Sequence, residues 1–395
     1  MKKNVLFIMN NLTCGGAEKA LISLLETIDY SVYNVDLFLF KHNGIFLSKI
    51  PSQVNLLEEP LKFKYFDMSI KTALKELVKE GDLVSAFSRI CAGFIFNKEK
   101  NRARCEQRVW KFLSRSMKPL EKEYDVAIGY LEKNPIYFCI EKVQAKKKIG
   151  FIHNDYIKLD MDPNLDHKYF NKLNNIITVS EECADVLKKK FPMYKEKVSV
   201  MYNIVSPNII NKMATEKIDL SYKGIKIISV GRLNYQKGYE LAIDACKQLA
   251  QQGYDFKWYV IGEGEERLKL EELIKINNLE ERFILLGLKE NPYPYIREAD
   301  IYVQSSRFEG KSIAIDEAKI LNKPIIVTNF STAKDQIKHG ENGLIVEMNG
   351  KSIAEGIENV IEDQALRNRI KLSLSKEKLG TEEEINKLYN YFNAV

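Results

Sequence analysis

Two glutamates, Glu309 and Glu317, stand eight positions apart across a predicted strand-to-helix turn. The apolar run 299–303 predicts the end of a buried strand, and the spacing of residues 313–321 predicts a helix. In an open α/β sheet, both carboxylates can then face the space above the strand ends, where such sheets bind their ligands.

The turn between the two glutamates reads Glu309-Gly310-Lys311-Ser312 and leads into Ile313. A glycine-containing turn into a helix N-terminus offers backbone N–H groups and a positive dipole end to an anion. A sugar–nucleotide diphosphate needs carboxylates that accept hydrogen bonds from its sugar hydroxyls and, beside them, backbone amides that donate to its phosphates. The alternative interpretation is two surface glutamates that flank a capped helix, and this stretch taken alone fits both.

Two cations, Arg232 and Lys237, lie in a loop that is bounded by Gly231 and Gly238 and follows the predicted strand 225–230. Arginine offers a planar fork of donors, and lysine offers a mobile point charge. Together they suit a diphosphate whose negative charge grows as it leaves.

A further loop starts at Gly262 and reads Gly262-Glu263-Gly264-Glu265-Glu266-Arg267 after the predicted strand 258–261. It begins like the dinucleotide pattern G-x-G-x-x-G, but Arg267 occupies the position of the third glycine. Its glutamates would also repel a pyrophosphate. We therefore reject a dinucleotide fingerprint here, which disfavours a nicotinamide oxidoreductase.

The first half of the chain offers a glycine turn and one histidine. Gly15 and Gly16 follow the predicted strand 4–10 and precede a helix, so they form either a loop against a ligand or an ordinary tight turn. His153 ends another predicted strand, where a sheet opens onto a ligand, although a structural histidine is the alternative. The D-x-D triplet 160–162 follows no strand and precedes a proline, so we interpret it as a loop and not as a metal motif.

Strands and helices alternate twice along the chain, which predicts an α/β protein with two doubly wound, Rossmann-like domains facing each other across a cleft. The 395 residues also favour two domains. The predicted limits are an N-terminal domain over residues 1–205, a linker region over 206–224, a C-terminal domain over 225–375, and a C-terminal helix over 376–395 that packs back on the N-terminal domain.

The composition narrows the class of protein. Apolar residues make up 45% of the chain, as in packed globular domains, and no apolar run reaches the ~18 residues of a membrane-spanning helix. The six cysteines have no metal-ligand spacing and fit a reducing cytoplasm, and four histidines make a multi-histidine metal site an unfavoured hypothesis. Residues 1–205 carry 33 Lys and Arg against 25 Asp and Glu, which indicates an anionic partner other than nucleic acid.

The basic region 102–118 contains a predicted helix in which Trp110 stands among several arginines. This composition is compatible with a helix that lies on an anionic membrane, with Trp110 at the interface. The alternative is an ordinary surface helix whose apolar stripe lies in the core. The predicted location is cytoplasmic, with possible peripheral contact at the inner face of the plasma membrane.

Taken together, these motifs resemble the family-4 retaining glycosyltransferases of the GT-B fold, and the resemblance extends through most of the chain. It implies that Arg232 and Lys237 bind the donor diphosphate and that Glu309 contacts the hydroxyls of the donor sugar. It also implies that Glu317 binds the nucleotide ribose and that His153 lies near the donor sugar. The positions assigned to the donor or its nucleotide are Gly15, Gly16, Arg232, Lys237, Gly262, Lys311, Ser312, Ile313 and Glu317.

The resemblance implies a transferase that needs no divalent metal or other cofactor. Lys311 and Ser312 depart from the commoner sequence between the two glutamates, which leaves the donor sugar open. The variant looks like sugar transferases of bacterial capsule, exopolysaccharide or teichoic-acid assembly. We expect a UDP-sugar donor and a saccharide or polyprenyl-diphosphate-linked acceptor. The alternatives are a GT-B-fold sugar-nucleotide epimerase and a non-catalytic sugar-nucleotide-binding partner subunit.

Overall fold

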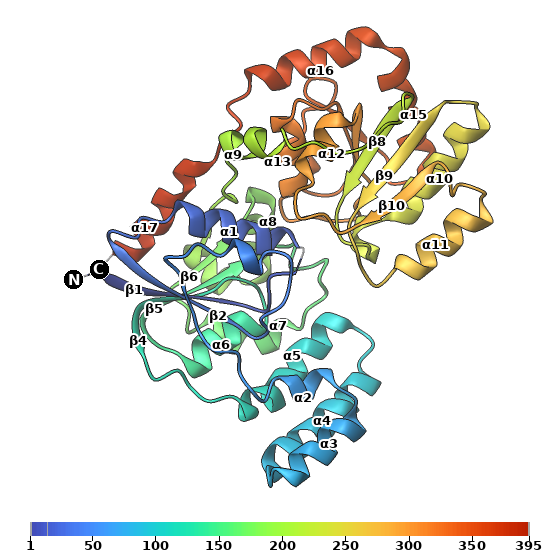
Figure 1. Cartoon of the computed structure of the whole chain (residues 1–395). Helices are drawn as coiled ribbons and strands as arrows, with labels where there is room; N and C mark the ends of the chain where they lie inside the picture. The colour runs from blue at the N-terminus through green and yellow to red at the C-terminus, as the bar shows by residue number, and fades with distance from the viewer. Residues whose placement is uncertain (1, 14, 394–395) are drawn as a thin grey trace. The chain divides into compact units, whose positions relative to one another are not determined.

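The computed structural model describes residues 2–13 and 15–393, which divide into two compact units. The first unit contains residues 2–13, 17–202 and 385–393, and the second contains residues 15–16 and 203–384. Each unit is built on one parallel sheet covered by helices, so the predicted pair of doubly wound α/β domains is confirmed (Figure 1).

The first unit contains a seven-stranded parallel sheet in the order β3-β2-β1-β4-β5-β6-β7. Its strands are near-continuous apolar runs because helices cover both faces of a parallel sheet. In the central strand β1, for example, all five residues from Val5 to Met9 are buried. The strands are β1 (Lys3–Met9), β2 (Tyr33–Leu39), β3 (Asn55–Leu56), β4 (Glu123–Gly129), β5 (Gln144–Ile152), β6 (Asn175–Thr178) and β7 (Val198–Val200).

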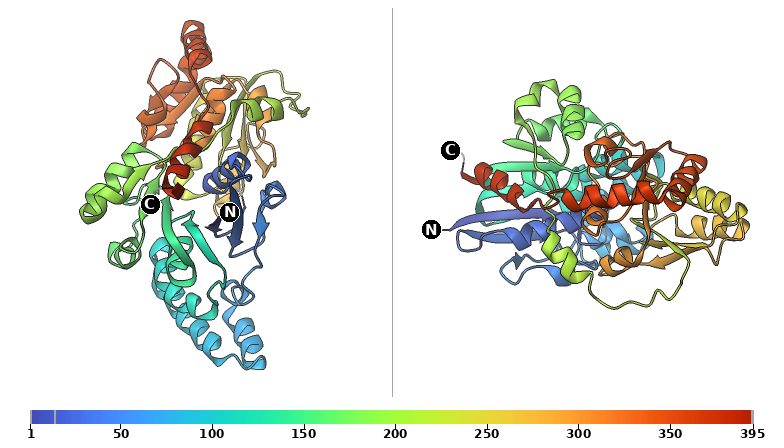
Figure 2. Two further views of the ribbon diagram at one scale, coloured as in Figure 1. Left: turned by 90° about the vertical axis from the view of Figure 1, so that its left-hand side faces the viewer. Right: turned by 90° about the horizontal axis from the view of Figure 1, so that it is seen from above.

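The last helix of the chain returns to this first sheet, as Figures 1 and 2 both show. Lys3 Nζ donates to the carbonyl of Phe392 at 3.0 Å, and the rings of Tyr33 and Tyr389 stack with centroids 5.1 Å apart. Residues 394–395 of the predicted C-terminal segment lie outside the described residues. The helices of this unit are α1 (Gly16–Thr27), α2 (Lys64–Asp67), α3 (Ile70–Lys79), α4 (Leu83–Lys98), α5 (Arg102–Leu113), α6 (Asn134–Lys142), α7 (Pro163–Phe170), α8 (Glu181–Lys190) and α17 (Ile385–Asn393).

The helices α2 to α5 form a helical excursion between β3 and β4, defined here as residues 62–118. Side chains cap its helices: Ser69, Asp82 and Asn101 each accept a hydrogen bond from a backbone N–H in the first turn of the helix that follows. Of the two interpretations of the basic region 102–118, the structure agrees with the ordinary helix whose apolar stripe lies in the core, and it excludes Trp110 from a membrane interface. Trp110 is 1% exposed, because α5 turns its apolar stripe into the core, and its Nε1 donates to Glu141 at 3.0 Å.

The second unit contains a six-stranded parallel sheet in the order β10-β9-β8-β11-β12-β13. Its strands are β8 (Ile225–Val230), β9 (Phe256–Ile261), β10 (Phe283–Gly287), β11 (Ile301–Gln304), β12 (Ile325–Thr328) and β13 (Leu344–Val346). Its helices are α9 (Pro207–Met213), α10 (Tyr239–Gln251), α11 (Arg267–Ile276), α12 (Tyr293–Glu298), α13 (Ile313–Ile320), α14 (Ala333–Gln336), α15 (Gly350–Glu362) and α16 (Gln364–Lys376).

Two apolar cores sandwich the second sheet. One core packs α10, α11, α15 and α16 on one face, and the other packs α9, α12, α13 and α14 on the opposite face. The region 206–224, which lacks a helical period in the sequence, nevertheless starts with the helix α9. That helix forms because Ile210 packs into the second core and is 2% exposed, a tertiary contact that outweighs weak local periodicity.

Candidate active site

The loops that carry the predicted cations and the first glutamate follow neighbouring strands at the point where the strand order of the second sheet reverses. The strand β8 lies between β9 on one side and β11 on the other, so connections leave it in both directions. The Arg232 loop follows β8, and the Glu309 loop follows β11. The carboxyl ends of neighbouring parallel strands share one sheet edge, and ligands of open α/β sheets bind at such a switch point.

Lys237 and Glu309 form an ion pair at this switch point, with 2.6 Å between Nζ and Oε1. Both side chains are largely buried, at 17% and 8% exposure. Three uncharged side chains also donate to this carboxylate: Ser306 Oγ at 2.6 Å, Gln304 Nε2 at 3.1 Å and Gln236 Nε2 at 3.3 Å. The carboxylate is therefore held in one orientation by four donors from two loops.

The sequence prediction did not include Gln236, Gln304 and Ser306. Gln304 also joins Glu309 to the start of the next helix. Its Oε1 accepts hydrogen bonds from Ser312 Oγ at 2.8 Å and from Tyr302 Oη at 3.1 Å. Gln304 and Ser306 are buried. A polar residue at the end of an apolar strand was the only signal in the sequence that pointed to them.

The loops of the switch point approach each other through glycines. Gly238 has φ +61°, and a Cβ there would lie 2.4 Å from the carbonyl oxygen of Ser305. Gly262 has φ +153°, and a Cβ there would lie 1.9 Å from the carbonyl oxygen of Gly231. Both positions therefore require glycine for packing of the loops alone, whatever Gly262 contributes to a donor.

Arg232 lies on the exposed side of this loop, one residue after Gly231. The buried side chain of Tyr239 holds this loop in place, since its hydroxyl donates to the carbonyl of Gly231 at 3.1 Å. Burial first, and then the nearby Glu309 carboxylate, raise the pKa of Tyr239 far above its usual value, so this hydroxyl stays protonated and keeps donating.

The turn between the glutamates is held by a residue that the sequence prediction missed, Gln336 of α14. Its Oε1 accepts from the Ser312 N–H at 2.8 Å, and its Nε2 donates to the Ser312 carbonyl and to Asp316 Oδ1, each at 2.8 Å. The expectation of a free N–H at Ser312 is therefore wrong, because the side-chain amide of Gln336 already occupies it. Ile313 begins α13 directly after this clamp.

Lys311 and Glu317 flank the same helix start. The ammonium of Lys311 lies 3.4 Å from Asp316 Oδ2, so its charge is partly compensated within the first turn of α13. Glu317 is 2% exposed and accepts from the hydroxyl of Tyr293 at 3.2 Å. The two predicted glutamates thus lie at opposite ends of one buried polar turn, each with its own donors.

His153 belongs to the first unit and directly follows β5. Its backbone N–H donates to Glu132 Oε2 at 3.1 Å, and Glu132 Oε1 accepts from the side chain of Asn154 at 3.3 Å. The sequence prediction missed Glu132, a buried carboxylate in the loop after β4. In the sequence, the only indication of a role for Glu132 was that an acidic residue follows shortly after an apolar strand.

The imidazole of His153 packs against the rings of Tyr130 and Phe151 and is 7% exposed. Burial lowers its pKa to about 4, although Glu132 and a hydrogen bond with the Tyr130 backbone act in the opposite direction. The ring is therefore neutral at pH 7. Its Nε2 is buried and has no hydrogen-bond partner among the described residues.

The remaining predicted positions lie elsewhere. Gly16 begins α1, and a Cβ there would meet no atom within 4 Å, so the described structure shows open space beside it and no close backbone approach. Gly15 precedes it in the same loop. Asp162 of the D-x-D triplet caps α7 by accepting from the N–H of Asn164, in agreement with a structural loop. Within residues 2–13 and 15–393, no group of three acidic, histidine or cysteine side chains has the arrangement of a metal site.

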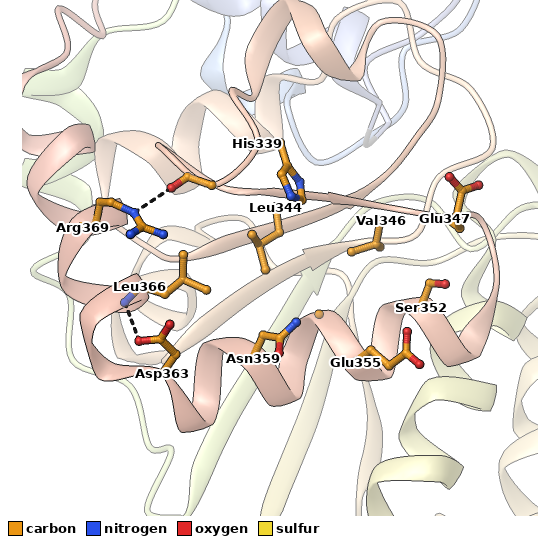
Figure 3. Close-up of a pocket in the computed structure, with 12 residues that line it drawn as sticks. His339, Leu344, Val346, Glu347, Ser352, Glu355, Asn359, Asp363, Leu366 and Arg369 are labelled. Carbon is orange, nitrogen blue, oxygen red and sulfur yellow. Dashed lines mark hydrogen bonds between the residues drawn. The ribbon is translucent and has the colours of Figure 1, made fainter.

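A separate cavity of about 430 Å³ lies between β13 and the helices α15 and α16 (Figure 3). Its lining is mixed: Arg369, Glu355 and Asn359 are polar, whereas Leu344 and Leu366 are apolar. None of the predicted site residues lines it. We therefore assign the candidate site to the switch point and not to this cavity.

Residues 213–373 match the family model described as "Glycosyl transferases group 1". The chain is 32% identical over 204 residues to the N-acetylgalactosamine-N,N'-diacetylbacillosaminyl-diphospho-undecaprenol 4-alpha-N-acetylgalactosaminyltransferase of Campylobacter jejuni, which covers 51% of this chain and 54% of the relative. It is 31% identical over 192 residues to the capsular polysaccharide biosynthesis glycosyltransferase CapM of Staphylococcus aureus, covering 46% and 50%. The chain thus spans about half the length of these curated relatives.

Among solved structures, HepE from Anabaena in complex with UDP and glucose superposes with a TM-score of 0.70 at 17% identity, and the match covers all of both chains. A likeness at this identity establishes the fold, and that fold is GT-B. The matched region 213–373 contains the whole switch point with Arg232, Lys237, Glu309 and Glu317. This chain therefore has the GT-B fold, and its residues 213–373 match the model of the group 1 glycosyl transferases.

Proposed function

We propose that this protein is a retaining glycosyltransferase that moves a sugar from a nucleotide-diphosphate donor, with UDP-sugars favoured, to a saccharide or lipid-linked acceptor in bacterial surface polysaccharide synthesis. The observation that carries the proposal is the buried pair of Lys237 and Glu309 at the strand-order switch of the second sheet. In this proposal the cation of the pair binds the donor phosphate and the carboxylate beside it binds sugar hydroxyls.

The donor diphosphate is the group that Arg232 and Lys237 would bind. In the reaction, the bond between the anomeric carbon and the diphosphate oxygen breaks, and a bond from the acceptor hydroxyl oxygen to that carbon forms on the same face. The departing phosphate oxygen takes the proton of the acceptor hydroxyl. Charge that grows on the leaving group is stabilised by Arg232 and by Lys237, which its ion pair with Glu309 holds in place. Such preorganised groups contribute most when they need no rearrangement.

The hydrogen bonds around Glu309 argue against its acting as a nucleophile. Its Oε1 already accepts from Lys237, Ser306 and Gln304, and its Oε2 accepts from Gln236. Three donors engage Oε1, which makes that oxygen a poor nucleophile, whereas Oε2 has one donor and can still accept a hydrogen bond from a sugar hydroxyl. We therefore propose that Glu309 positions the sugar and that no glycosyl-enzyme forms on it.

Two further features support the choice of partners. The structural neighbour HepE was crystallised with UDP and glucose, and the Campylobacter relative is named for an undecaprenol diphosphate-linked saccharide. We propose that the chain uses the same classes, a UDP-linked donor and a polyprenyl-diphosphate-linked or saccharide acceptor. In this proposal His153 lies near the donor sugar as a neutral hydrogen-bonding group, Glu317 binds the ribose, and no metal ion is required.

The direct test is a donor screen with a polyprenyl-diphosphate-linked acceptor, in which mass spectrometry of the product identifies the transferred sugar. The anomeric configuration of that product is then compared with the configuration of the donor. The proposal predicts an elongated acceptor with retained configuration and free nucleotide diphosphate in equal amount. Release of nucleotide without acceptor elongation would instead indicate the epimerase, and donor binding without turnover would indicate the non-catalytic partner subunit.

A further inference from the structure

The 16-residue helix α4 of the excursion is built with its large apolar side chains facing outward. Leu83, Val84, Phe87, Ile90 and Phe94 recur at the spacing of one helix face, and Phe94 is 72% exposed. All three exposed phenylalanines of the described residues lie on this helix, the third being Phe96. We call the five-residue stripe from Leu83 to Phe94 the α4 apolar face.

The buried side of α4 consists of small residues and of Arg89, whose guanidinium donates to backbone carbonyls of the preceding segment. Ala86, Ala92 and Gly93 face the neighbouring helices, and a Cβ on Gly93 would lie 2.1 Å from Ile70 Cδ1 of α3. The small side allows α3 and α4 to pack closely, so the outward orientation of the large residues is fixed by this packing. A contiguous apolar stripe of this kind on the solvent-exposed surface of a protein marks a binding site.

The charge of the excursion indicates what binds there. Residues 62–118 carry 14 Lys and Arg against 6 Asp and Glu, whereas the rest of residues 1–205 carries 19 of each. The positive excess of the first half of the chain therefore lies entirely within the excursion. On the helix next to the α4 apolar face, Lys71, Lys75 and Lys79 are exposed.

A second copy of the chain fits this surface poorly, because a symmetric interface would bring two strongly positive excursions together.

An anionic lipid bilayer fits both the apolar stripe and the positive charge, since its headgroups attract lysines and its acyl region accepts Phe and Leu side chains. We propose that the α4 apolar face inserts into the surface of an anionic membrane and that the lysines of α3 contact its headgroups. This contact replaces Trp110 as the membrane-facing element, and it does not depend on the chemistry at Glu309. Among the described residues, no helix is long and apolar enough to cross a membrane.

The test is co-sedimentation of the full-length protein with vesicles of phosphatidylcholine alone or with about 30% phosphatidylglycerol. We expect binding to the anionic vesicles, weaker binding in high salt, and at least tenfold weaker binding for the double variant Phe87→Glu, Phe94→Glu. The matched control is Leu268→Glu on α11, an equally exposed apolar position at 80% exposure, which should bind like the wild type. Both altered side chains point to solvent, so each variant should keep the thermal midpoint of the wild type.

A second readout reports insertion itself. Trp110 and Trp258 are buried, at 1% and 0% exposure, so the tryptophan in a Phe94→Trp variant would be the one accessible to brominated lipids. Quenching of this added signal supports insertion. Unchanged binding of the double glutamate variant, or equal binding to neutral vesicles, would overturn the proposal. So would a wild-type dimer in light scattering that the double variant abolishes, because the face would then be an interface between two copies.

Discussion

Lys237 and Glu309 lie 72 positions apart in the sequence, yet their side chains join the β8 and β11 loops through a 2.6 Å contact. Neither group alone would be stable in this position, because an unpaired buried charge costs several kcal/mol. Together they hold a cation and a carboxylate at fixed positions before any donor arrives. This preorganisation is the property that charge-stabilising catalysis requires.

The Arg232→Ala variant tests the phosphate side of the site. Arg232 is exposed beside the glycine loop, so its loss should leave the fold unchanged while it removes one group that stabilises the departing diphosphate. We expect a loss of about 2–4 kcal/mol of transition-state stabilisation, or roughly 30- to 1,000-fold in turnover. The matched control is Lys351→Ala, an exposed cation on α15 at 77% side-chain exposure, which should retain full activity. Near-wild-type turnover in Arg232→Ala would remove this residue from the mechanism.

A double-mutant cycle tests whether Lys237 and Glu309 act as one unit. Each of Lys237→Ala and Glu309→Gln breaks the same hydrogen-bonded pair, so the second substitution should cost much less in the background of the first. We expect a coupling free energy of about 1–3 kcal/mol in turnover measured with saturating donor. Additive losses would show that the two side chains contribute independently, despite their contact.

The close approach of the two loops is tested by substituting a glycine. Gly238→Ala places a methyl group in left-handed backbone and against the Ser305 carbonyl, whereas Gly253→Ala meets only the first of these costs, because nothing lies within 4 Å of its Cβ. We expect Gly253→Ala to lower stability by about 1–2 kcal/mol and Gly238→Ala to lower it by at least ~1 kcal/mol more. Thermal unfolding of the two variants measures the difference. Equal thermal midpoints would contradict the inferred clash.

The neutral state of His153 predicts a dependence of stability on pH. Its folded pKa of about 4 lies below the ~6.5 of an unfolded chain. Between these values the unfolded chain binds more protons, so the free energy of unfolding falls as the pH falls from 6.5 towards 4. The full effect is about 3 kcal/mol. Urea unfolding at pH 7 and pH 4.5 should show a larger loss for the wild type than for His153→Gln, and parallel losses would contradict a buried neutral ring.

The sequence was sufficient to predict the fold, because parallel strands covered on both faces appear as short apolar runs separated by glycine turns. It also placed Arg232, Lys237 and Glu309 after the correct strands. Contact between Lys237 and Glu309 could not be read from it, since strand order in space depends on long-range pairing such as that of β8 with β11. The same limit applies to Glu132, whose partner His153 follows a different strand.

One prediction failed, and one of two open interpretations was excluded, each for an identifiable physical reason. The Ser312 N–H is not free because Gln336, 24 positions later, accepts from it, and no local pattern predicts a glutamine that reaches across from another helix. The arginines around Trp110 left a membrane-facing helix and an ordinary surface helix open, and the structure agrees with the second, because the helix turns Trp110 inward to meet Phe40 and Tyr137. Composition indicates which helices are basic, whereas tertiary packing decides which face reaches the surface.

The predicted roles of His153, Glu309, Glu317 and the donor-binding positions stay predictions, and a measurement of donor binding tests them. We would record the thermal midpoint of the wild type and of Lys237→Ala with UDP-, GDP- and ADP-sugars and with NAD. A ligand at 100 times its dissociation constant stabilises the folded state by about 2.7 kcal/mol. The account predicts stabilisation by one nucleotide-sugar class that Lys237→Ala abolishes. Stabilisation by NAD alone, or a sugar-nucleotide response that survives in Lys237→Ala, would contradict it.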